Sequence, residues 1–251
     1  MGRVFPIDPG AAMLRALYTL VLGVGLLLAL PWLLFRVATR ERYRRGLLER
    51  FALRLPPRRQ RERIWIHAAS AGEMVAAAAL ARQIAQCEPR FEVVMSSTTT
   101  AGVEVASRLL PDLVRFIAPV DVGLVARRGF RRMAARVLGL VELELWPNWM
   151  SAAEHLGLPV AVANGRVGET TARRLRWSVA RRLLGTDQVA IWAVQSDEVR
   201  ERLLRAGVPE SRIEVTGNVK VDVDRPTNRT RAALRDELRF AGDPFVGLAG
   251  S

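Results

Sequence analysis

Residues 64–97 read IWIHAASAGEMVAAAALARQIAQCEPRFEVVMSS, and this stretch decides the fold class. A short apolar run at 64–67 is followed by a turn of small residues and by a helical stretch to about Gln86. A second apolar run then covers residues 91–97. A helix between two apolar strands is typical of a βαβ unit, in which the two strands are parallel. The stretch therefore predicts a parallel sheet with a helix packed on it.

The same alternation continues toward the carboxyl end of the chain. Apolar runs that predict strands lie at 114–120, 137–145, 159–164, 189–195 and 213–215. Helical stretches lie between several of them, at 146–156, 170–184 and 197–206. Strands that are apolar throughout are covered by helices on both faces of their sheet. We therefore expect an α/β fold, a Rossmann-like doubly wound parallel sheet, over residues 64–240.

Composition narrows the range of functions. The 251 residues are 50% hydrophobic, which is enough for a folded core. A single cysteine, Cys87, excludes an internal disulfide, and two distant histidines, His67 and His155, do not form a metal-ligand pattern. We expect no metal site. The net charge of +13 attracts polyanions, either nucleic acid or an anionic membrane surface.

A long apolar segment near the amino terminus predicts a membrane helix. Residues 16–35 read ALYTLVLGVGLLLALPWLLF and contain no charge. A helix of this length spans about 30 Å, which matches the hydrocarbon core of a bilayer. We therefore expect a membrane anchor over residues 1–37. Because Pro31 and two glycines weaken a straight span, a helix or hairpin that lies in the interface stays an alternative. A cleaved signal peptide is disfavoured by the length of the apolar run.

The segment after this helix is strongly basic. Residues 36–63 hold eleven arginines and three glutamates. Their net charge of +8 is more than half of the +13 of the whole chain. By the positive-inside rule this flank stays in the cytoplasm, and it attracts anionic headgroups. We therefore expect a basic juxtamembrane segment at 38–63, a membrane partner rather than nucleic acid, and a globular part on the cytoplasmic face of the inner membrane.

Polar residues gather where the expected strands end. Ligands of doubly wound sheets bind at the carboxyl ends of the strands. Most of the unusual polar residues of the chain lie there, in the segments 67–73, 96–102, 142–148, 164–166, 195–196 and 216–222. The pattern predicts a ligand site along this edge of the sheet.

Glu73 is the first candidate for a catalytic group. It follows Gly72, which we expect to permit a tight turn from strand to helix. A carboxylate at the start of a helix beside the ligand edge is placed to accept a proton from a substrate hydroxyl. The helix N-terminus stabilises its charge. Residue pattern alone equally allows Glu73 to be a helix cap.

Two further segments carry candidate groups. Glu142 and Glu144 alternate along an expected strand and so face the same side. Burying two glutamates is costly, so we expect them to emerge beside the cleft, although an arginine-paired structural network is the alternative. Lys220, the only lysine of the chain, follows a strand end and a glycine turn. Its ammonium could neutralise a leaving phosphate or a substrate carboxylate, or it lies in an exposed turn.

Six motifs follow one another along the chain: HAASAGE (67–73), STTTAG (97–102), VELELWPN (141–148), VANGRV (162–167), AVQSDEVRERLLRAGV (193–208) and VTGNVKVD (215–222). They are preceded by the amino-terminal apolar segment and by ERYRRGLLERF (41–51). In their order and spacing these motifs resemble one family, the transferases of 3-deoxy-D-manno-octulosonic acid (Kdo) in lipopolysaccharide synthesis.

The resemblance implies two facing Rossmann-like domains, the GT-B arrangement, with the acceptor held by the amino-terminal one. It implies an inverting glycosyltransferase that moves Kdo from CMP-Kdo to a lipid A precursor, lipid IVA, without a metal or another cofactor. Glu73 matches the general base of the family, and Glu142 and Lys220 match its transition-state-stabilising residues. The expected substrate-binding residues on the matching motifs are Ser70, Gly72, Thr98, Thr99, Glu144, Asn164 and Arg166.

Residues 241–251 look like the first strand of a second, donor-binding domain, so we expect the chain to be the amino-terminal part of such an enzyme. The alternative is a non-catalytic, membrane-bound fragment that still binds the lipid A precursor.

Overall fold

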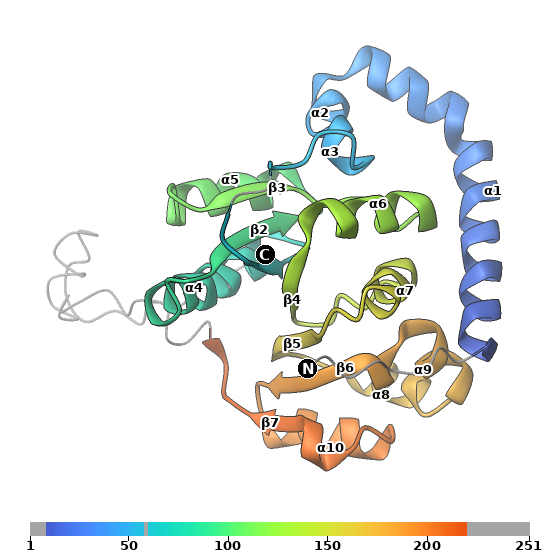
Figure 1. Ribbon diagram of the computed structural model, residues 1–251. Helices are drawn as coiled ribbons and strands as arrows, with labels where there is room; N and C mark the ends of the chain where they lie inside the picture. The colour runs from blue at the N-terminus through green and yellow to red at the C-terminus, as the bar shows by residue number, and fades with distance from the viewer. Residues whose placement is uncertain (1–8, 58–59, 220–251) are drawn as a thin grey trace, which may run out of the picture.

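Seven parallel strands form the centre of the molecule, in the spatial order β3-β2-β1-β4-β5-β6-β7 (Figure 1). This computed structural model describes residues 9–57 and 60–219. All six neighbouring pairs of strands are parallel, as the alternating sequence pattern predicted. The strands are β1 (Arg63–His67), β2 (Glu92–Ser97), β3 (Val114–Ile117), β4 (Ala135–Val141), β5 (Val160–Gly165), β6 (Val189–Val194) and β7 (Ile213–Val215).

The strand order reverses between β1 and β4. The chain builds outward from β1 to β3, returns to the middle, and then builds in the other direction from β4 to β7. The helices change face at the same point (Figure 1). One face is covered by α4 (Ala71–Cys87) and α5 (Thr100–Leu109), and the other by α6 (Gly123–Met133), α7 (Pro147–His155), α8 (Glu169–Leu175) and α10 (Asp197–Arg205). The expected doubly wound fold is confirmed.

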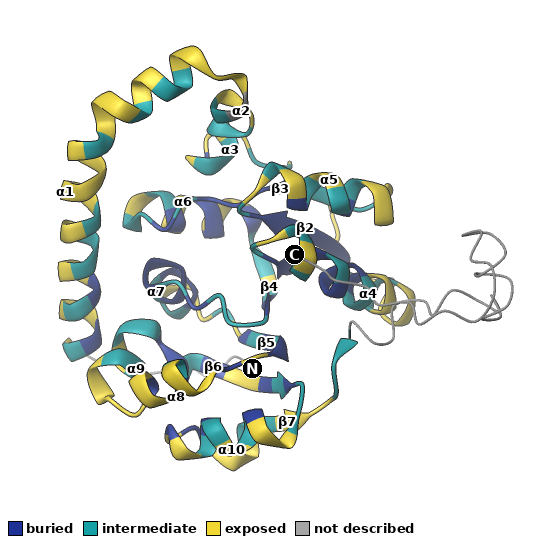
Figure 2. Cartoon of the chain, turned by 180° about the vertical axis from the view of Figure 1, so that it is seen from behind, coloured by how far each residue is buried: buried dark blue, intermediate teal, exposed yellow. Residues whose placement is uncertain are grey.

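Each face of the sheet has its own core (Figure 2). Under α4, a run of buried alanines lets the helix approach the strands closely. On the opposite face, Trp65 of β1 packs against Phe116, Phe130 and Trp149, with ring centroids 5.7, 4.8 and 5.0 Å away. These aromatic rings bury large apolar areas, so they fix α6 and α7 against β1.

The expected elements differ from the observed ones in three places. Helix α6 was not predicted from the sequence. The expected helix 170–184 is two helices, α8 and α9 (Ser178–Leu184), with an extended Trp177 between them. The expected strand 137–145 ends at Val141, because Glu142 adopts a left-handed φ of 64°, which no β-strand accommodates. Thus Glu142 and Glu144 do not alternate along a strand, and that expectation was wrong.

Helix α1 (Pro9–Thr39) is longer than the apolar segment 16–35 from which it was predicted. It continues through Pro31, and it is long and apolar enough to cross a membrane, with a mean hydropathy of 2.2 over its most apolar stretch. Two short helices follow it, α2 (Glu41–Arg44) and α3 (Leu47–Arg50). The segment after α1 packs on the sheet domain instead of forming a separate linker, since the Glu49 carboxylate accepts from the Ile117 N–H at 2.5 Å.

Candidate active site

The reversal of strand order brings two loops together. In doubly wound sheets the ligand crevice lies at such a switch point, outside the carboxyl ends of the strands. Here the loop after β1 carries Glu73 and the loop after β4 carries Glu142 and Glu144. Burial raises the pKa of Glu144, and the charges of Glu73 and Glu142 nearby add to this rise. The topology therefore assembles the acidic residues that the sequence singled out.

Glu73 lies in the first turn of α4 and is held by its own loop. The Ala69 N–H donates to Glu73 Oε2 at 2.9 Å, and the Ser70 hydroxyl donates to Oε1 at 2.8 Å. Ser70 is the N-cap, and its Oγ accepts from the Glu73 N–H at 3.2 Å. This reciprocal arrangement is of the capping-box type, and it fixes the position of the side chain. The carboxylate remains half-exposed, so a substrate can still approach it.

Gly72 does not have the role that we expected. It lies within α4 with ordinary helical backbone, so the turn from strand to helix does not depend on a glycine. No atom lies within 4 Å of the place where its Cβ would be. Because Gly72 has no side chain, the space next to it in the first turn of α4 stays open.

The threonines after β2 hold the neighbouring loops in place. The Thr98 hydroxyl donates to the Ala69 carbonyl at 2.6 Å and so ties the β2 loop to the loop that holds Glu73. Thr99 is the N-cap of α5, and its Oγ1 accepts from the Gly102 N–H at 3.1 Å. A Cβ at Gly102 would lie 2.1 Å from Ser97 Oγ, so this close approach requires glycine. The structure thus shows loop contacts for both threonines.

The loop after β4 is built differently. The Glu142 N–H donates to the Ala163 carbonyl at 3.0 Å, so the sheet ladder continues while the backbone turns out of the strand. A left-handed φ at a glutamate is a strained conformation, and such strain is concentrated at functional sites. Two residues on, Glu144 Oε2 accepts from the Trp146 indole N–H at 2.7 Å. Burial, more than its acidic neighbours, raises the pKa of Glu144.

Asp121, which sequence reasoning missed, supports this loop from behind. Its carboxylate accepts from the Trp149 N–H at 2.9 Å, and its carbonyl accepts from the Asn148 side chain at 2.7 Å. Burial raises the pKa of Asp121 to about 6, although the Tyr18 hydroxyl and the backbone contacts with α7 lower it. The aspartate directly follows an apolar strand in the sequence, which is the signal that could have found it.

His67, at the end of β1, is a buried neutral group. Burial lowers its pKa to about 3. Its Nδ1 lies 2.8 Å from Ser96 Oγ, which also accepts from the Trp65 indole N–H at 2.8 Å. The ring packs on Trp149 at a centroid distance of 4.7 Å. These contacts join the ends of β1 and β2 to α7 and so support both acidic loops.

Asn164 connects β5 to the segment before Lys220. It is buried with a φ of 53°, and its Oδ1 accepts from the Val219 N–H at 3.1 Å. The Gln195 side chain donates to its carbonyl at 3.0 Å. Arg166 is exposed in the loop after β5. Lys220 lies outside the described residues, so its expected role stays a prediction.

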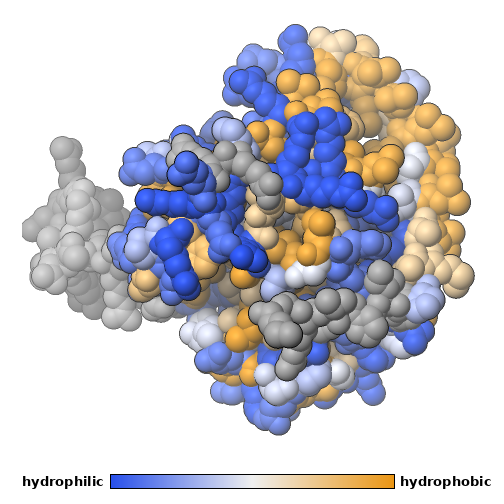
Figure 3. All heavy atoms as spheres, in the orientation of Figure 1, coloured by the Kyte–Doolittle hydropathy of each residue, from blue (hydrophilic) through white to orange (hydrophobic). Residues whose placement is uncertain are grey.

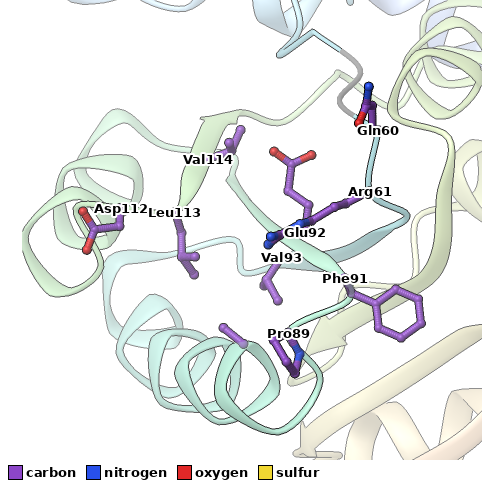
Figure 4. Close-up of a pocket in the computed structure, with 10 residues that line it drawn as sticks. Gln60, Arg61, Pro89, Phe91, Glu92, Val93, Asp112, Leu113 and Val114 are labelled. Atoms are coloured by element: carbon purple, nitrogen blue, oxygen red, sulfur yellow. The ribbon is translucent and has the colours of Figure 1, made fainter.

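Two cavities lie at the other edge of the sheet. One of about 700 Å³ is lined by Arg61, Glu92 and Asp112 among others, at the amino ends of the central strands (Figure 4). Glu92 in its lining belongs to a buried ion pair, in which Arg63 donates to Glu92 at 2.6 Å and also to the carbonyl of Pro57. Because ligands of doubly wound sheets bind at the carboxyl edge, we place the site at the glutamates rather than in this cavity. Within residues 9–57 and 60–219, no cluster of histidine, cysteine, aspartate or glutamate is arranged to hold a metal ion.

Solved structures share this fold at low sequence identity. The S. aureus MnaA–UDP complex matches with a TM-score of 0.52 at 14% identity. The match covers 71% of this chain and 51% of the MnaA chain. The UDP-GlcNAc 2-epimerase of Neisseria meningitidis, bound to UDP-GlcNAc, gives 0.52 at 11% identity, with 72% and 55% covered. These likenesses show the fold alone. This shared fold and the reversal of strand order define the class of the chain as a Rossmann-like, doubly wound domain of the GT-B fold.

The family is shown by sequence. A family model described as 3-deoxy-D-manno-octulosonic-acid transferase (kdotransferase) matches residues 45–223, and the chain belongs to this family. The resemblance inferred from the motifs is therefore confirmed.

Curated relatives named 3-deoxy-D-manno-octulosonic acid transferase agree with this assignment. The relative from Chlamydia pneumoniae is 26% identical, over 94% of this chain and 55% of its own length. The relative from Haemophilus influenzae is 29% identical, over 90% of this chain and 53% of its own length. The relative from Bordetella pertussis is 32% identical, over 75% of this chain and 44% of its own length. The chain spans about half the length of these relatives.

Proposed function

We propose that the intact protein is an inverting glycosyltransferase that transfers Kdo from CMP-Kdo to a hydroxyl group of a lipid A precursor, lipid IVA, in lipopolysaccharide core biosynthesis. The observation that carries the proposal is the group of three glutamates at the switch point of the sheet, on a chain of the Kdo transferase family. The same family membership supports the CMP-activated donor and the lipid acceptor. The reaction needs no metal or other cofactor, since side chains supply its acid–base and charge-stabilising groups.

Glu73 acts as the general base in this proposal. The acceptor hydroxyl attacks the anomeric carbon of Kdo while the bond from that carbon to the phosphate of CMP breaks, and CMP leaves with the electron pair. The hydroxyl proton passes to Glu73, whose carboxylate is oriented by Ala69 and Ser70 and lies half-exposed where the strand order reverses. A base fixed in this way contributes about 10²–10⁴-fold to the rate.

Glu142 and Lys220 stabilise the transition state in the same scheme. A negative charge on Glu142 favours the positive charge that develops on the sugar ring, and the Lys220 ammonium favours the leaving phosphate. Ser70, Gly72, Thr98, Thr99, Glu144, Asn164 and Arg166 form or support the acceptor side of the crevice in this proposal. For Thr98, Thr99 and Asn164, the loop contacts described above support a role in shaping the crevice.

The protein works at the cytoplasmic face of the bacterial inner membrane in this proposal. The apolar helix α1 and the arginine-rich segment after it support membrane association, and the lipid acceptor resides there.

The test is a transfer assay with the intact enzyme in membranes, CMP-Kdo and lipid IVA, with and without a metal chelator. We expect transfer of Kdo with inverted anomeric configuration and the same rate in the chelator. Retention of configuration, loss of activity in the chelator, or binding of lipid IVA without transfer would each contradict the proposal; the last would favour a lipid-binding protein.

A further inference from the structure

Helix α1 is fastened to the sheet domain at its amino-terminal end. Arg15 forms a buried ion pair with Glu154 of α7, and its Nε donates to the Leu183 carbonyl of α9 at 3.3 Å. One turn later, the Thr19 hydroxyl lies 2.7 Å from Asn148 Oδ1. Both charged side chains of the ion pair are only 5% exposed, and separating a buried pair leaves uncompensated charges. This end of α1 therefore stays with the domain.

The chain is also fastened to the same domain immediately after α1. Besides the Glu49 contact with β3, the Val120 N–H donates to the Arg50 carbonyl at 2.9 Å. Arg132 of α6 donates to the Leu53 carbonyl at 2.7 Å, and Ala52 is completely buried. At the far end of α1, the Arg36 guanidinium packs over the ring of Trp32 in the same helix and over that of Tyr43 in α2, at 5.0 and 5.4 Å, and so joins α1 to α2.

Between these two attachments, α1 is exposed and apolar. Residues 20–35 are exposed or half-exposed on every side of the helix, and Figure 3 shows hydrophobic residues gathered along the edge that α1 forms. A helix that is apolar all round requires an apolar environment. The returning segment adds exposed Leu48, Phe51 and Leu53 next to several arginines, a combination that fits an anionic lipid surface.

A helix with both ends on one domain cannot cross the bilayer. Residues 20–39 are long enough to span about 30 Å, but the chain would then have to return through the same thickness. Only residues 40–46 separate α1 from α3, and even fully extended they reach about 25 Å. A span would break either the contacts of Arg15 and Thr19 or those of residues 49–53.

We propose that α1 lies along the plane of the membrane, immersed in the leaflet on the side of the sheet domain, with the returning segment 46–53 beside it. Its partner is the lipid bilayer, and this topology rests on the membrane association proposed above. The structure thereby favours the interfacial helix, which the sequence left open, over a single spanning anchor.

Cysteine labelling on the full-length protein tests this topology without relying on transfer activity. Exposed positions are chosen so that the fold is preserved: Met13 before the apolar stretch, Leu28 within it, and Arg44 after it, which are replaced one at a time by cysteine in a Cys87→Ser background. The native Cys87, exposed at the end of α4, reports the side of the sheet domain. Sealed inside-out and right-side-out vesicles are treated with a membrane-impermeant maleimide.

We expect Met13→Cys and Arg44→Cys to be labelled from the same face as Cys87, and Leu28→Cys to be labelled only after detergent is added. Labelling of Met13→Cys from the opposite face would show a spanning helix and overturn the topology while leaving the proposed membrane association intact. Labelling of Leu28→Cys without detergent would overturn the lipid contact itself. Disulfide-linked dimers through Leu28→Cys would assign this face to a second copy of the chain.

Discussion

Glu73 after β1 and Glu142–Glu144 after β4 lie at the same edge of the sheet, yet the two loops hold their carboxylates in different ways. Glu73 lies in an unstrained helix turn, and both of its oxygens accept hydrogen bonds from its own loop. The loop after β4 has a left-handed Glu142 and a Glu144 whose pKa is raised by burial. One loop therefore holds a single fixed carboxylate, while the other holds two carboxylates beside a strained backbone.

Replacing the fixed base has the largest expected effect. Glu73→Gln keeps the shape of the side chain and removes its basicity, so turnover of the intact transferase should fall about 10²–10⁴-fold. The acceptor KM should change little, because the crevice keeps its form. Steady-state kinetics with CMP-Kdo and lipid IVA measure both constants. A raised KM at unchanged turnover would make Glu73 a binding residue.

Two variants of Glu142 distinguish the role of its negative charge from the role of its strained backbone. Glu142→Gln and Glu142→Gly both remove the negative charge, and we expect each to lower turnover about 10²-fold. Glycine also relieves the left-handed strain at φ 64°, so Glu142→Gly should be more stable than the native protein by about 1 kcal/mol. Kinetics and urea unfolding of both variants check this. Normal turnover in Glu142→Gly would reduce Glu142 to a backbone role.

Asn164 acts on the site indirectly, because it holds the segment that precedes Lys220. Asn164→Gly accepts the left-handed backbone but loses the hydrogen bond to Val219, so turnover should fall about tenfold. Gln195→Ala is the matched control, since it removes the neighbouring bond to the Asn164 carbonyl and leaves the Val219 bond in place. Equal losses in both variants would show that Asn164 acts only through general loop stability.

The smallest effect concerns pH and the support behind the loops. The raised pKa of Asp121, about 6, means that the folded state gains stability as pH falls from about 6 toward the ordinary value of about 4. The lowered pKa of His67, about 3, has the opposite effect on stability: the folded state loses stability as pH falls below about 6.5. Asp121→Asn leaves the His67 effect uncompensated, so its urea midpoint should drop more between pH 7 and pH 5 than that of the native protein. An equal drop would contradict this account.

The strands could be predicted because their apolar runs are local features. The same reasoning could have found α6, since its buried residues Ala126, Gly129, Phe130 and Met133 have helical spacing, but its arginines obscure the pattern. The end of β4 could not be predicted, because the left-handed turn at Glu142 depends on its contact with Ala163 in the next strand. Neither could the attachment of α1, which needs Glu154 and Asn148 from a distant helix.

The site was predictable to a similar degree. The strand ends predicted where Glu73, Glu142 and Glu144 would gather, because parallel strands place their carboxyl ends at one edge. Their different environments could not be predicted, since burial and cross-loop bonds such as that from Thr98 to Ala69 arise only on folding.

The central claim is that the Glu73 carboxylate serves as a base and not merely as a helix cap. Ser70→Ala breaks the capping box at a cost of about 1 kcal/mol of stability, and it keeps the Glu73 carboxylate with one of its two hydrogen bonds, the one from the Ala69 N–H. Turnover of Ser70→Ala and Glu73→Gln, measured side by side in the intact enzyme and normalised to the folded fraction, separates the two roles. We predict that Ser70→Ala stays within a few-fold of the native rate while Glu73→Gln falls about 10²–10⁴-fold; similar rates in the two variants would contradict the claim.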